Sequence, residues 1–110
     1  MVEQILEAAG FIRNKTYRET RFLKPPANQT YCIYNDTEEI RGHDSANAIV
    51  FHEVNVEMYE YVPDPTSEAA LEVALDQAAM PYIKQNRYWM NDEQLYQIIY
   101  EFNYTIKKGD

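Results

Sequence analysis

The chain is poor in cysteine, glycine and positive charge, and it has no long hydrophobic run. Cys32 is the only cysteine, which excludes an internal disulfide and a multi-thiolate zinc site and is typical of a buried structural thiol. Three glycines are too few for a P-loop or a dinucleotide-binding turn. No window reaches the ~20 apolar residues of a transmembrane helix, and the N-terminus lacks a signal-peptide pattern. We therefore expect a protein made in the cytoplasm, with no membrane partner.

Acidic residues outnumber basic ones by 18 to 10, which gives a net charge of −8 at pH 7. Such a surface repels a phosphate backbone, so nucleic acid is not expected as a bound partner. Solubility is the simplest explanation of the acidity. The ten tyrosines favour half-buried sheet surfaces and interfaces. A chain of 110 residues with this composition predicts a single domain over residues 1–110.

The first third of the chain predicts a short helix followed by a connector. Apolar residues at helical spacing precede Gly10, which offers a C-terminal stop. Residues 11–28 include the pair Pro25-Pro26, which predicts an extended connector. The connector is basic in an acidic chain, which suggests a charge partner in the same chain or in another subunit; a solvated loop is the alternative. Its five cations are Arg13, Lys15, Arg18, Arg21 and Lys24.

Two short strands and one long strand are predicted next. Residues 30–35 are rich in β-branched and aromatic side chains, Asp36-Thr37 is interpreted as a turn, and residues 38–42 as a returning strand. Residues 43–48 form a polar loop, interpreted as the arm of a hairpin. Residues 49–62 then alternate strictly, so we expect one packed and one wet face. The packed face carries Val50, His52, Val54, Val56 and Met58.

After Pro65 the period changes to that of a helix, with Thr66 or Ser67 as the predicted N-cap. Glu68, Glu72 and Asp76 fall at i, i+4 and i+8, so one helix face is acidic. This row is either a solvated face or a surface that repels DNA or meets a basic partner. In both cases a charge reversal there should change stability by less than ~0.5 kcal/mol. The predicted buried stripe consists of Leu71, Ala74, Leu75 and Ala78.

Two further strands, residues 82–90 and 95–108, complete the pattern, and the second has the longest regular alternation in the chain. The resulting order α-β-β-β-α-β-β predicts an α+β fold. We expect a single small sheet of about five mainly antiparallel strands with two helices on one face. The other face would expose Tyr59, Tyr61 and Trp89, which favours coverage by a neighbouring subunit.

No pattern in the chain indicates catalysis. Two histidines without converging partners do not predict a metal site, and His52 is expected to be a hydrogen-bonded residue of the packed face. There is no Gly-x-Ser-x-Gly elbow and no cysteine with a histidine in register. We therefore predict no enzyme activity, no catalytic residue, no metal and no cofactor.

Four segments together resemble a known family: "YCIYND", "EEIRGHDSANAIVFHEVNVEMYEY", "SEAALEVALDQ" and "YIKQNRYWMNDEQLYQIIYEFNY". The family is that of the small tail-completion, or tail-terminator, proteins of long-tailed phages and prophages of Gram-positive bacteria. The shared features are a Tyr-rich strand, an Arg-Gly-polar-Asp loop leading into a long strand with His-Glu, and the "LYQ…YEF" ending. The resemblance spans residues 31–104 and leaves out the basic connector.

The resemblance implies a virion protein that forms a ring, hexameric in this family, on the head-proximal end of the tail tube. There it would stop polymerisation of the tube protein and present a surface to the head connector, or stopper, protein. It also implies a small sheet with helices on one side and no catalytic site. DNA would be a passing cargo that is not bound.

This role suggests candidate residues. Acidic side chains facing the channel would repel DNA within a Debye length of ~8 Å, and the helix row competes for this position with Glu53 and Glu57 of the long strand. The candidate subunit interface consists of Tyr59, Tyr61, Arg18 and Arg21. The candidate axial loop consists of Arg41, Gly42, His43, Asp44, Ser45 and Asn47.

Other functions use the same features. An acidic phage-encoded inhibitor of the DNA-mimic type would also carry the −8 charge, as a monomer or dimer with carboxylates over one convex face. Another head–tail neck component, or an accessory subunit of an enzyme, is a further alternative.

Overall fold

The computed structural model describes residues 1–42 and 48–107. In chain order the elements are α1 (Val2–Ala8), β1 (Tyr17–Glu19), β2 (Tyr31–Arg41), β3 (Ile49–Glu60), α2 (Pro65–Gln77), β4 (Ile83–Lys84), β5 (Tyr88–Met90) and β6 (Leu95–Lys107). The predicted α+β class with two helices and a single sheet is confirmed. Neither helix of the described chain is long and apolar enough to cross a bilayer.

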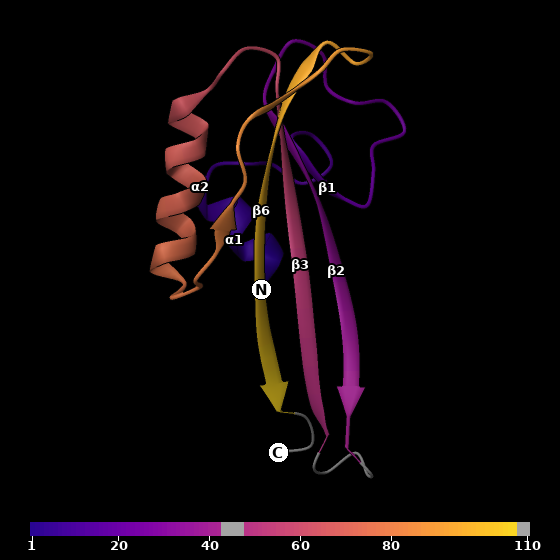
Figure 1. The fold of residues 1–110 in the computed structure, drawn as a ribbon, viewed down its shortest axis with the longest axis vertical. Coiled ribbons are helices and arrows are strands. Elements are labelled where there is room, and N and C mark those ends of the chain that lie inside the picture. The colour runs from indigo at the N-terminus through magenta and orange to yellow at the C-terminus, as the bar shows by residue number, and fades with distance from the viewer. Residues whose placement is uncertain (43–47, 108–110) are drawn as a thin grey trace.

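The sheet is built around β3, which pairs along its length with β2 on one side and β6 on the other (Figure 1). The strand order is β1-β2-β3-β6-β4, and β5 also pairs with β6. All pairs are antiparallel except β1–β2, so the sheet is mixed. The terminal strands β1 and β4 therefore lie at opposite edges of the sheet.

Alternation along the three long strands separates two faces of the sheet. Even-numbered residues of β2, β3 and β6 form the helix face, on which α1 and α2 pack; Val54, Val56 and Met58 are at most 2% exposed. Two tyrosine hydroxyls of this face hold α1: Tyr17 donates to Glu7 and Tyr34 donates to Glu3. Odd-numbered residues form the open face, which neither α1 nor α2 covers. The predicted assignment of the two faces of residues 49–62 is thus confirmed.

The predicted turn at Asp36-Thr37 is wrong. β2 runs without interruption over 11 residues, and each of them has a register partner on β3, from Tyr31 opposite Tyr59 to Arg41 opposite Ile49. Pairing with a long neighbouring strand thus outweighs the local turn preference of Asp and Thr.

The sheet has six strands instead of about five. β1 lies inside the basic segment that was predicted to be a connector; Tyr17 anchors it, fully buried, beside Cys32 of β2. The predicted strand 82–90 is divided into β4 and β5, which pair with different parts of β6. Elements of two or three residues are too short to give a periodic signal in the sequence.

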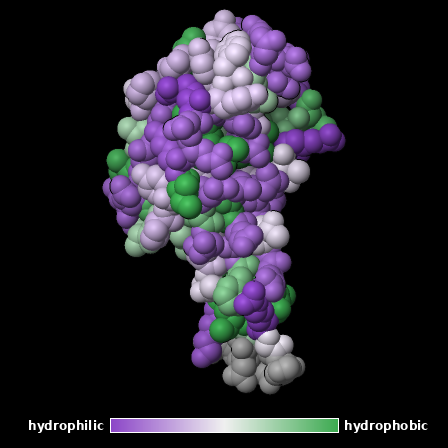
Figure 2. All heavy atoms as spheres, viewed as in Figure 1, coloured by the Kyte–Doolittle hydropathy of each residue, from purple (hydrophilic) through white to green (hydrophobic). Residues whose placement is uncertain are grey.

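The lower halves of β2, β3 and β6 continue past both helices as a three-stranded extension, residues 37–41, 49–53 and 103–107 (Figure 1). The molecule measures 47 × 28 × 23 Å, and Figure 2 shows the extension as a narrow column beneath a broader head. On the helix-face side of this column Ile40 and Ile106 are 58% and 49% exposed.

Truncating a core residue of β6 should test the face assignment. Phe102 is buried in the main apolar cluster, so Phe102→Ala is expected to lower the free energy of unfolding by roughly 3–5 kcal/mol. Ile106→Ala, on the same strand and face but half exposed, is the matched control and should cost much less. Chemical denaturation measures both. Equal losses would mean that the core does not lie where the structure places it.

Candidate functional site

Helix α2 begins at a cap made by Asp64, not by Thr66 or Ser67 as predicted. The Asp64 carboxylate accepts hydrogen bonds from the Ser67 backbone N–H at 3.0 Å and from the Ser67 hydroxyl at 2.7 Å. Thr30 donates to the same carboxylate at 2.6 Å. Desolvation raises the pKa of Asp64, but these hydrogen bonds outweigh it, and the pKa is lowered. Pro65 occupies the first helical turn, where its missing N–H costs nothing.

The acidic row on α2 is not a solvated face at Glu68 and Glu72, which corrects the simplest expectation for these two residues. Glu68 is buried, and its carboxylate lies 3.0 Å from Lys84 Nζ and 2.5 Å from Arg87 Nη2. Glu72 accepts from Lys84 Nζ at 2.8 Å and from the Tyr100 hydroxyl at 2.8 Å. The two cations come from the segment that follows the helix, so they neutralise much of the row.

A third carboxylate, that of Glu60, completes this network from the sheet. Glu60 is fully buried; Arg87 Nε lies 3.1 Å from one oxygen, and the Asp64 backbone N–H donates to the other at 3.2 Å. Burial, and then the neighbouring Glu68 carboxylate, raise the pKa of Glu60 to about 7. Burial also raises the pKa of Glu68, but hydrogen bonds with Glu60, Arg87 and Lys84, in that order, together lower it more. The network ties residues 82–90 to α2 and β3.

On the open face, the two predicted strand glutamates differ. The Glu57 carboxylate accepts from the Tyr59 hydroxyl at 2.5 Å and is also reached by Asn35 and Gln97. In the described part of the chain, the Glu53 side chain has no hydrogen bond or ion pair. Tyr59 is half-buried and stacks on Tyr31, 5.1 Å between ring centroids. The structure thus places the two glutamates on one face but leaves only Glu53 available.

Other candidates are exposed or fall outside the described residues. Arg18 and Arg21 are exposed and form no ion pair within residues 1–42 and 48–107, and Tyr61 is 49% exposed. Asp76, the last residue of the helix row, is exposed as well. Arg41 pairs with Glu39 at 3.0 Å, and Gly42 follows it at positive φ. The remaining axial-loop candidates lie outside the described residues: His43, Asp44, Ser45 and Asn47.

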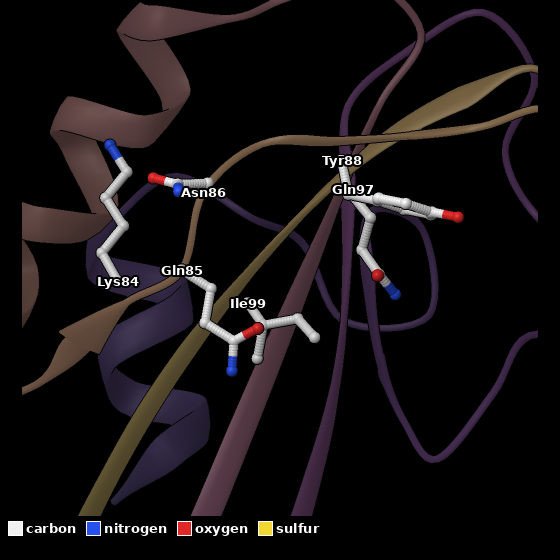
Figure 3. A pocket seen from close by; sticks show the side chains of 6 residues that line it. All are labelled: Lys84, Gln85, Asn86, Tyr88, Gln97 and Ile99. Carbon is white, nitrogen blue, oxygen red and sulfur yellow. The ribbon is translucent and has the colours of Figure 1, made fainter.

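A hollow of about 540 Å³ opens beside the upper part of β6 (Figure 3). Its lining consists of Lys84, Gln85, Asn86, Tyr88, Gln97 and Ile99. Three of the six side chains are amides, and the one cation is already paired with two carboxylates. Such a lining can form hydrogen bonds with a polar partner, but it offers no general base or nucleophile.

His52 stands in a polar cluster that sequence reasoning only partly predicted. Its Nδ1 lies 2.8 Å from the Asp36 carboxylate, its ring stacks on Tyr104 at 4.4 Å, and the Tyr104 hydroxyl donates to Asp36 at 3.3 Å. Burial, and then the Asp36 carboxylate, raise the pKa of Tyr104 to about 12. His52 Nε2 faces the Glu38 carboxylate at 3.9 Å, not a hydroxyl or a thiol that it could activate. Because Asp36, His52 and Tyr104 belong to β2, β3 and β6, the cluster joins the three long strands. Asp36 was missed because it was assigned to a turn.

Within the described residues, no group of three or more His, Cys, Asp or Glu side chains is placed to hold a metal ion. The predicted buried thiol is confirmed: Cys32 is fully buried, and this burial raises the pKa of its thiol well above the ordinary value. Neither protein-family models nor curated protein sequences match the chain.

Charge reversal should distinguish the two ends of the acidic row. Glu68→Lys places a cation beside Lys84 and Arg87 in a buried position, so we expect a loss of roughly 3 kcal/mol or more in unfolding free energy. Asp76→Lys, on the exposed part of the row, should change it by less than ~0.5 kcal/mol. The expectation that charge reversal at Glu68, Glu72 or Asp76 leaves stability almost unchanged is therefore revised for Glu68. Thermal and urea denaturation measure both variants; similar small losses would contradict the buried network.

The raised pKa of Glu60 predicts a pH dependence of stability. Between pH 4.5, the ordinary pKa of a glutamate, and about pH 7, Glu60 keeps its proton in the folded chain but has released it in the unfolded chain. The contribution of this group is therefore fully present below pH 4.5 and is lost as pH rises through 7. The unfolding free energy of the wild type, relative to Glu60→Gln, should fall across this range. Urea denaturation at constant ionic strength tests this, and a constant difference would contradict it.

Proposed function

We propose that this chain is a structural virion protein that forms a ring on the head-proximal end of a phage tail tube. The ring ends polymerisation of the tube and joins the tail to the head connector. The observation that carries the proposal is the combination of a long three-stranded extension with a sheet face that no helix covers. Both features leave surface that a stable monomer does not need, and both suit a subunit of an assembly.

The extension supports this role through its apolar residues. Ile40, Val50 and Ile106 stand side by side on its three strands, and the two isoleucines are about half exposed. Exposed apolar residues in register on a protruding sheet favour a protein partner over water. In the proposed ring, this surface contacts the tube protein or the connector protein along the axis.

The distribution of charge decides which acidic row faces the channel in this proposal. Glu68 and Glu72 are paired with Lys84 and Arg87, whereas Glu53 stands unpaired on the open face within the described chain. An unpaired carboxylate keeps its full field and repels passing phosphates, so DNA crosses the ring without binding. We therefore assign the lumen to the open face. The pairing of the helix row also favours this function over a DNA mimic, which needs an array of free carboxylates.

Deleting the gene from the phage or prophage that encodes it tests the proposal. Negative-stain microscopy of the induced particles should show overlong or ragged tubes beside full heads without tails. Restoring the gene in trans should restore complete virions. Normal virions without the gene would overturn the proposed function and favour the acidic inhibitor. Normal tubes that fail to join heads would instead favour another neck component.

A further inference from the structure

Unpaired cations gather along one edge of the sheet. Lys15, Arg18, Arg21 and Lys24 lie in and around the terminal strand β1; all four are exposed, and none forms an ion pair in the described residues. Of the five cations, only Arg13 forms an ion pair within residues 1–42 and 48–107, with Glu3 at 3.9 Å. Arg18 stands opposite Ile33 of β2, which places its side chain on the open face. The basic segment thus lacks the intrachain partner that its composition suggested.

Unpaired carboxylates lie on the open face toward the other edge: Glu101 stands on β6 beside the terminal strand β4, and Glu53 stands on the central strand β3. A hollow of about 290 Å³ on the open face includes Glu53 and Glu101 in its lining, with Asn55 and Asn103 between them. In the described chain these four side chains form no hydrogen bond or ion pair. Ile83 of β4 also lines the hollow, is 66% exposed and stands opposite Glu101.

We propose that the β1 edge of one copy docks beside the β4 edge of the next copy, with Arg18 directed toward Glu101 in the hollow; Glu53, one strand further from this edge, stays unpaired and faces the channel. The sheet order places β1 and β4 at opposite ends, so copies standing side by side bring these edges together. The contact joins two different surfaces, so it repeats from copy to copy and closes when the rotation allows a ring. That the copies close into a ring rests on the proposed function, whereas the contact itself is inferred from the residues along the two edges of the sheet.

Charge and apolar area play different parts in this contact. Exposed ion pairs contribute only ~0–1 kcal/mol each, so the cations mainly orient the copies and exclude the reversed arrangement. Apolar area comes from Ile83 on one copy and from Leu23, 78% exposed among the cations, on the other. Rising salt should weaken the association, because these charges are screened.

Chemical cross-linking of purified protein tests the contact even when association is transient. We place one cysteine beside β1 and one beside β4, as Thr20→Cys with Gln85→Cys, and add a short bismaleimide. Within one chain β1 and β4 are separated by about four strand spacings, ~19 Å, which is too far for such a linker. Cys32 is fully buried and does not react. Covalent dimers and higher multimers are expected, whereas each single-cysteine variant should give far fewer.

Charge reversal on this background tests the named residues. Arg18→Glu should lower the yield of multimers at least about tenfold, and adding Glu101→Arg should restore it. Arg41→Glu, at the far end of β2, and Asp76→Arg, on α2, make the same charge changes away from β1 and from the hollow and should leave the yield unchanged. Absence of multimers, or a yield that does not depend on Arg18, would overturn the inference. If the cross-linking fails but the gene deletion gives overlong tubes, only the proposed contact is wrong. If the gene deletion gives normal virions, the proposed function is wrong.

Discussion

The alternation of side chains along β3 is the constraint on which the rest of the structure depends. β3 is the only strand of the described chain that pairs along its length on both sides, so it fixes the register of β2 and β6. Its even-numbered residues bury their side chains against the two helices, whereas the odd-numbered ones face away. A shift of one residue would exchange the two faces of all three strands. The register of β3 therefore determines which face of the sheet the helices cover and which face stays open.

The alternation along β3 also determines where charges are paired, through the network around Glu60. Because Glu60 lies on the buried face of β3, it needs a cation, which Arg87 supplies from the segment after α2. Arg87 and Lys84 also pair with Glu68 and Glu72, so only Asp76 of the helix row stays unpaired within the described chain. Glu53 and Glu101 stay unpaired on the open face, and Lys15, Arg18, Arg21 and Lys24 stay unpaired along one edge of the sheet, within the described chain. These are the surfaces that we assign to the channel and to neighbouring copies.

The long elements could be predicted from the sequence, and the pairings between distant segments could not. Twelve alternating residues of β3 and the 3.6-residue stripe of α2 are periodic signals that tertiary structure rarely overrides. The continuous β2 contradicts the turn preference of Asp36-Thr37, because the pairing with β3 is invisible until both strands are placed. Likewise, nothing near Glu68 in the sequence indicates Lys84 or Arg87, which are 16 and 19 residues away.

The position of the protein in a virion is the most direct test of this account. Gold-labelled antibodies against the chain can be applied to intact, tail-bearing particles and viewed by electron microscopy. The account predicts label at a single place, the junction between the tail tube and the head. Label along the whole tube, or particles that carry none while the free protein is labelled, would contradict it.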